Sequence, residues 1–230
     1  MKANSSNPIE VYLEVGKKRI FASAIDWPGW CRSGRDEESS LRALFDFGLR
    51  YAGVLQPSSI FFNTPADVSV FTVIERLKGD ATTDFGAPGA APSSDARPVD
   101  DIALQHMTTL LEACWLAFDN AVKAATGKEL SKGPRGGGRD LQGIARHVFD
   151  GDSSYLRSIG GKFKIIEDDD PDRELRRIRN VILAALVAAA RGELPAQGPR
   201  GGIYWTPRYF VRRSAWHVLD HTWEIEDRML

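Results

Sequence analysis

The chain has 230 residues and a mass of 25.4 kDa, which fits one large domain or two small ones. Its 30 basic residues nearly cancel its 31 acidic residues, and the net charge of −1 argues against a polyanion-binding protein. Two cysteines are too few for a disulfide framework, and no apolar run reaches the roughly 20 residues that span a bilayer, so we expect a cytoplasmic protein that binds neither nucleic acid nor membrane.

The first strands are predicted from alternation of apolar and polar residues. Residues 9–15 and 19–25 alternate in this way, and Gly16-Lys17-Lys18 lies between them, which indicates a β-hairpin. Pro28 and Gly29 end the second strand, because proline removes a hydrogen-bond donor and glycine permits a turn. The hairpin, Asp26-Trp27-Pro28-Gly29-Trp30 and the segment that follows resemble HicB-like antitoxin domains, which would imply a small binding or docking module.

The rest of this first unit is predicted to contain one helix and more strand. Residues 37–54 show helical periodicity, with Asp36 as the N-cap. Residues 68–74 are β-branched and aromatic and predict a third strand, and residues 60–62 could add a short one. The sequence therefore predicts a small α+β domain over residues 1–78.

A stretch rich in glycine, proline and serine follows, and we place the domain boundary there. Residues 79–98 are interpreted as an ordered loop or linker. Residues 99–230 then contain four segments with helical periodicity, which together could form a four-helix bundle around one core. These segments are residues 99–126, 141–159, 171–191 and 207–227.

The ends of these helices have clear signals. Asp140 is a candidate N-cap, and Asp170-Pro171 and Thr206-Pro207 each place a proline at the first helical position. Gly160-Gly161 and Gly192 end the second and third helices. A glycine-rich connection, residues 133–138, joins the first two helices and lacks the pattern of a phosphate-binding loop.

The positions of the histidines are the strongest functional signal. His217 and His221 are four residues apart, so both rings lie on one face of the last helix. His147 lies in the middle of the second helix, and a bundle core is where facing helices assemble metal sites. Three imidazoles with an open position would form a catalytic type of site, although the pair on its own could be structural.

Two segments carry a resemblance to a known family. Arg139-Asp140-Leu141-Gln142-Gly143-Ile144-Ala145-Arg146-His147-Val148 and Trp216-His217-Val218-Leu219-Asp220-His221-Thr222-Trp223-Glu224 resemble the second and last helices of the DinB-like (YfiT-like) metal-binding four-helix bundles. The resemblance implies that His147, His217 and His221 hold a divalent metal such as zinc or nickel. It also implies a low-molecular-weight thiol as a second cofactor, since some members are thiol-dependent transferases or isomerases.

Several other polar residues near these motifs are open to two interpretations. Asp152 could hold a ligand near the metal, but a solvated or capping role is the simpler expectation. Asp220 could orient an imidazole or form an exposed ion pair. His106 is expected to lie outside the site. The arginines Arg139, Arg212 and Arg213 could bind an anionic substrate or the carboxylate of a thiol, but surface solvation is the simpler expectation. The tryptophans Trp115, Trp216 and Trp223 could line a pocket, but core packing is the simpler expectation for them, and Cys114 is expected to be a small buried residue.

Two classes of function remain open from the sequence. The first is a metal-dependent enzyme that acts on a small molecule, either a thiol-dependent transferase or isomerase or a hydrolase. The second is a non-catalytic binding or stress-response scaffold with an N-terminal docking module, which could be a homodimer.

Overall fold

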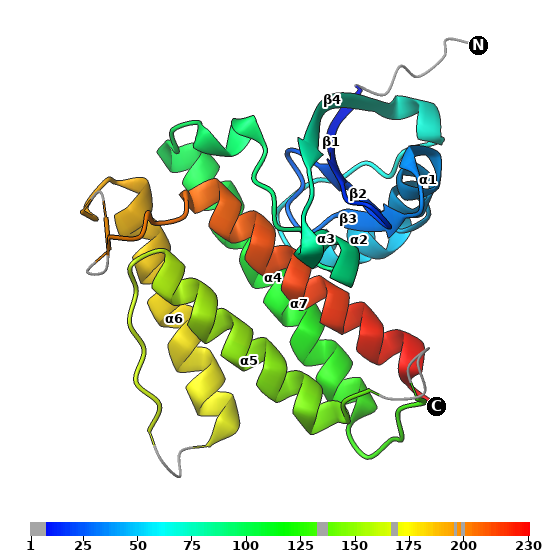
Figure 1. The fold of residues 1–230 in the computed structure, drawn as a ribbon. Helices are drawn as coiled ribbons and strands as arrows, with labels where there is room; N and C mark the ends of the chain where they lie inside the picture. Colours follow the sequence, from blue (N-terminus) through cyan, green and yellow to red (C-terminus); the bar gives the residue numbers. More distant parts are fainter. Residues whose placement is uncertain (1–7, 133–137, 167–169, 196, 199–200) are drawn as a thin grey trace. The chain divides into compact units, whose positions relative to one another are not determined.

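The computed structural model describes residues 8–132, 138–166, 170–195, 197–198 and 201–230. The chain divides into two compact units, one ending at Ala96 and one that comprises Arg97–Leu230 (Figure 1). The first unit is a small four-stranded sheet with short helices, and the second is helical, so the fold class is α+β as predicted.

The sheet of the first unit has the strand order β3-β2-β1-β4. Strands β1 (Ile9–Val15) and β2 (Ile20–Ala24) are antiparallel, with Val15 opposite Ile20, which confirms the predicted hairpin. Strand β4 (Phe71–Lys78) pairs in parallel with β1. Strand β3 (Cys31–Gly34) was not predicted, because four residues without an apolar alternation give no strand signal.

Three predictions for this unit are corrected. The predicted helix is two helices, α1 (Glu37–Asp46) and α2 (Gly48–Leu55), which meet at Phe47 just before Gly48. The predicted strand over residues 68–74 starts as a short 3₁₀ turn, Val68–Val70, so β4 begins only at Phe71. Residues 60–62 form no strand. The predicted cap is correct, since Asp36 accepts a hydrogen bond from the Ser39 backbone N–H and Ser39 donates to Asp36 in turn.

Most of the predicted linker belongs to the first unit. It contains the helix α3 (Ala81–Phe85) and a 3₁₀ turn, Ser93–Ala96, and the compact unit ends at Ala96. The buried carboxylate of Glu14 on β1 accepts hydrogen bonds from Thr83 Oγ1 and from the backbone N–H groups of Gly89 and Ala90. This carboxylate anchors the loop to the sheet, so residues 79–96 are an ordered loop.

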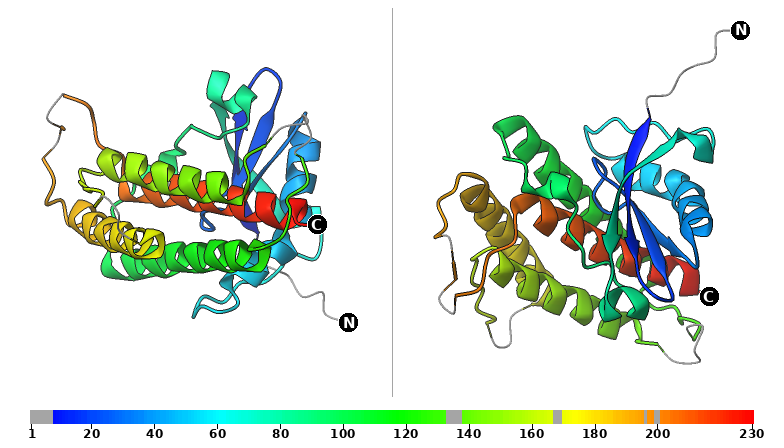
Figure 2. Two further views of the ribbon diagram at one scale, coloured as in Figure 1. Left: turned by 90° about the horizontal axis from the view of Figure 1, so that it is seen from below. Right: turned by 45° about the horizontal axis from the view of Figure 1, so that its top comes forward.

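The second unit consists of four long helices, each of which contacts the other three (Figure 2). They are α4 (Asp101–Ala125), α5 (Leu141–Ser158), α6 (Pro171–Ala190) and α7 (Pro207–Arg228). Apolar side chains on one face of each helix are fully buried and form the core of the unit, among them Leu110, Leu111, Phe118, Ile144, Val148, Leu156, Ile178, Leu186, Phe210 and Leu219.

Three of the four predicted helix starts of this unit are confirmed, and the first helix begins at Asp101 instead of residue 99. Asp140, Asp170 and Thr206 each accept a hydrogen bond from a backbone N–H in the first turn of their helix. Residues 133–137 of the predicted glycine-rich connection lie outside the described residues. Among the helices that the structure describes, none is both long enough and apolar enough to cross a membrane.

Candidate metal centre

The three histidines of the predicted metal site come from two helices of the second unit. His147 lies near the middle of α5, seven residues after its N-cap Asp140. His217 and His221 lie one turn apart on α7, so their side chains leave the helix on the same face. Since α5 and α7 contact each other, His147 faces the pair across the helix interface.

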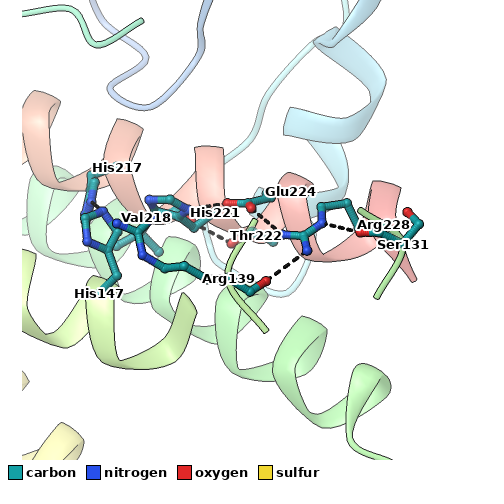
Figure 3. A network of polar contacts seen from close by, with 9 residues as sticks. All are labelled: Ser131, Arg139, His147, His217, Val218, His221, Thr222, Glu224 and Arg228. Carbon is teal, nitrogen blue, oxygen red and sulfur yellow. Dashed lines mark hydrogen bonds and ion pairs between the residues drawn. The ribbon is translucent and has the colours of Figure 1, made fainter. Parts of the chain in front are cut away.

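The three imidazoles converge on one point (Figure 3). One ligand atom from each ring lies within 4.8 Å of the others. The Nε2 atoms of His147 and His217 are 3.2 Å apart. Two nitrogen ligands of one tetrahedral zinc ion, each about 2.0–2.1 Å from the metal, lie about 3.3 Å apart. The spacing of these two atoms therefore fits a shared metal ion as well as it fits a hydrogen bond between rings.

The environment favours the neutral form of two of these imidazoles, those of His217 and His147. His217 is 6% exposed, and burial, followed by the charges of His221, His147, Arg213 and Arg139, lowers its pKa to about 2. Burial is also the main cause that lowers the pKa of His147. A neutral imidazole has a free lone pair, which is the form that binds a metal. The site is thus prepared to bind a cation at neutral pH.

A carboxylate orients the third histidine. Glu224, one turn after His221, lies 2.7 Å from its Nδ1 atom (Figure 3). The hydrogen bond with His221 is the main cause that lowers the pKa of Glu224. Glu224 is therefore an ionised carboxylate, which can accept hydrogen bonds but cannot donate one. Nδ1 of His221 therefore carries the proton, and in the neutral ring the lone pair is on Nε2. A metal-binding histidine commonly has such a carboxylate partner.

Glu224 is itself held in place by Arg228. The Nη1 atom of Arg228 donates to Glu224, while its Nε and Nη2 atoms donate to the backbone carbonyls of Ser131 and Arg139 (Figure 3). Sequence reasoning missed Glu224 and considered Asp220 for this role. The i, i+3 spacing of His221 and Glu224 and the i, i+4 spacing of Glu224 and Arg228 are the signals that could have identified it.

We expect Glu224→Ala to weaken metal binding by about 10- to 100-fold, because the His221 ring loses the partner that orients it. Metal affinity is measured by competition with a chromophoric chelator. The matched control is Glu226→Ala on the same helix, at an exposed position. An unchanged affinity in the Glu224 variant would mean that the carboxylate does not support the site.

Asp152 has a different environment from the one expected. It was predicted to be solvated or capping, but it is 1% exposed, and neither of its carboxylate oxygens has a hydrogen-bond partner in the part of the chain described. Burial raises its pKa to about 7, and the charge of Arg179 opposes this effect. The misprediction arises because a polar residue at a core position of a helix is not recognisable from its type alone.

The neighbours of Asp152 come from α4 and α6. Arg179 on α6 forms a two-pronged ion pair with Asp119 on α4, at 2.7 and 2.8 Å. The Nε atom of Arg179 and the Nε1 atom of Trp115 are buried and, among the described residues, have no hydrogen-bond partner. The second unit therefore holds an incompletely paired group of polar atoms in its interior.

The remaining candidates divide between the core and the surface. Trp115, Trp216 and Trp223 are buried as predicted, and Cys114 is a fully buried free thiol whose pKa is raised by burial. Arg212 is 7% exposed, so the expected surface role is wrong for it, whereas Arg139 is exposed as expected.

His106 on α4 is not part of the three-histidine group, as expected.

The chemistry of the three-histidine group fits a divalent ion of the first transition row. Neutral imidazoles suit zinc, copper, iron and nickel, whereas calcium and magnesium prefer oxygen ligands. Three ligands also leave a position open for a further molecule. His147, His217 and His221 would hold the ion, and Glu224 would orient His221.

Comparisons with protein-family models, with curated proteins and with solved structures find no match to this chain. The interpretation of the centre therefore depends on its own geometry and on the chemistry of its residues.

Proposed function

We propose that the protein is a metal-dependent enzyme that acts on a small molecule, with His147, His217 and His221 as the metal ligands. The observation that carries this proposal is the convergence of three imidazoles whose ligand atoms lie within 4.8 Å of one another. A divalent ion in such a site lowers the pKa of a water molecule or thiol bound to it, so that a nucleophile is available near neutral pH.

The protein's own residues would prepare this centre. Burial holds His217 neutral, and Glu224 directs the lone pair of His221 toward the centre of the group. The proposed class is that of the DinB-like four-helix bundles, which the helix motifs resemble. A low-molecular-weight thiol would make the reaction a transfer or an isomerisation, and water alone would make it a hydrolysis.

We expect about one divalent ion per chain when the protein is purified without a histidine tag in metal-replete medium, as measured by elemental analysis. Each of His147→Ala, His217→Ala and His221→Ala should lose the ion. His106→Ala is the matched control and should keep it, since His106 lies outside the group.

The absence of metal from the wild-type protein would contradict the proposal and favour a non-catalytic scaffold.

If the metal is present, thermal stability is measured with and without low-molecular-weight thiols. A ligand at a concentration of 100 times its Kd stabilises the folded state by about 2.7 kcal/mol, so a thiol that binds should raise Tm by several degrees. A thiol that binds only to the metal-loaded protein would support transferase or isomerase chemistry over hydrolysis.

A further inference from the structure

Two arginines lie beside the three-histidine group, and neither is a metal ligand. Arg139 precedes the N-cap of α5, and its side chain extends toward the rings of His147 and His217 (Figure 3). Burial and the neighbouring imidazoles are the main causes that lower the pKa of both histidines, and the charge of Arg139 contributes to each. Its guanidinium is thus close enough to act on both rings.

The position of Arg139 is set by the network that orients His221. Its backbone carbonyl accepts a 2.8 Å hydrogen bond from Nη2 of Arg228, which also binds Glu224. In the part of the chain that the structure describes, the guanidinium of Arg139 forms no hydrogen bond or ion pair, and the residue is exposed. The backbone of Arg139 is therefore fixed while its charged end remains available to a ligand.

Arg213 lies on α7 one turn before His217. Its guanidinium is 4.7 Å from the ring centre of Trp216 and 5.6 Å from that of Tyr155, so two aromatic faces hold it in place. Tyr155 in turn contacts the His217 ring edge-on, with 5.5 Å between the ring centres. These contacts place a second, half-buried cation next to the most buried of the three imidazoles.

Two acidic residues near the group have partners of their own. Glu224 binds both His221 and Arg228, and Asp150 pairs with Arg146 at 3.1 Å on the outer face of α5. Arg139, Arg213 and a divalent ion would together place three positive groups around the centre. Such a field attracts anions, and guanidinium groups match carboxylate and phosphate oxygens in geometry.

We propose that the ligand of this centre is a small anionic molecule, which Arg139 and Arg213 bind through a carboxylate or phosphate group beside the three histidines. This inference rests on the proposed function only in taking the three-histidine group as the reaction centre. It narrows the substrate class to molecules with an acidic group and disfavours neutral and cationic ones.

The test uses the full chain loaded with zinc, titrated calorimetrically with inorganic phosphate and, separately, with malonate. We expect saturable binding of at least one of them, and the tighter one distinguishes a phosphate from a carboxylate ligand. Arg139→Gln and Arg213→Gln should each weaken binding by about 10- to 100-fold. Arg213→Lys should recover part of the loss, because it keeps the charge but not the planar geometry.

Arg157→Gln is the matched control, since it removes one positive charge from an exposed position on α5 and should leave anion affinity unchanged. The metal content of each sample is measured as well. A metal-loaded protein that binds neither anion up to about 10 mM, or binds them equally well in both arginine variants, overturns this inference and leaves the proposed function intact. If the purified protein holds no metal but still binds the anions through Arg139 and Arg213, the result supports this inference and contradicts only the proposed function.

Discussion

Replacing Gly151 by alanine should weaken metal binding by about 100-fold or more, because the methyl group would occupy the space of the His217 ring. Gly151 lies one turn after His147 on α5, and a Cβ atom there would overlap Cε1 of His217 and lie 2.9 Å from its Nδ1. His217 is buried, so its ring cannot move aside without disturbing the core. The absence of a side chain at position 151 therefore allows the two helices to bring their histidines together.

The effect on stability should differ from the effect on the metal. Alanine is a better helix former than glycine by about 0.5–1 kcal/mol, and this gain offsets part of the steric cost. The free energy of unfolding of the metal-free variant should therefore fall by less than the free energy of metal binding. Affinity is measured by competition with a chelator, and unfolding by chemical denaturation. Gly53→Ala is the control, since Gly53 is exposed in α2 and has no atom near the added carbon. Wild-type affinity in a folded Gly151→Ala protein would show that the ring of His217 is not needed where the structure places it.

Replacing Asp152 by leucine should stabilise the folded protein by several kcal/mol at pH 8. The carboxyl is 1% exposed and has no hydrogen-bond partner among the described residues, so its ionisation is costly in the folded state. A pKa raised from 3.8 to about 7 corresponds to about 4 kcal/mol. Replacement of a buried charged group by an apolar residue of similar size is often stabilising.

The pH dependence gives a second measure of the same effect. Between pH 4 and 7 the folded wild-type protein keeps a proton on Asp152 that the unfolded chain has released, so this carboxyl makes stability fall as the pH rises through that range. Above pH 7 Asp152 is ionised in the folded state too, and the full free-energy cost of its buried charge is present. The buried histidines act in the opposite sense, because the unfolded chain binds protons on them below about pH 6.5. The difference in the free energy of unfolding between wild type and Asp152→Asn, measured as a function of pH, isolates the contribution of the carboxyl.

The control for both measurements is Asp150→Asn, an exposed position two residues earlier, which should change stability by less than about 0.5 kcal/mol. If Asp152→Leu is less stable than wild type at pH 8, the carboxyl has a stabilising partner when folded. Loss of activity in a stabilised variant would show that the unpaired carboxyl serves the reaction.

Much of the second unit could be predicted from the sequence because helix signals act over one or two turns. The N-caps Asp140, Asp170 and Thr206 and the prolines after them mark helix starts through local hydrogen bonds and a fixed φ angle. The alignment of His217 and His221 on one face follows from the helical period alone. The predictions that failed in the first unit concern Phe47, residues 60–62 and the start of β4, where tertiary packing decides between helix, turn and strand.

Local pattern by itself thus determined the class of the fold, the four helices of the second unit and one pair of imidazoles. Only the tertiary structure shows that His147, 70 residues before His217, lies 3.2 Å from it, and that Gly151 provides the space for this contact. The burial of Asp152 and the bond from Glu224 to His221 likewise depend on which helix faces which. The physical reason is range: helical periodicity relates residues within a few turns, whereas contacts between helices are selected by the packing of the whole core.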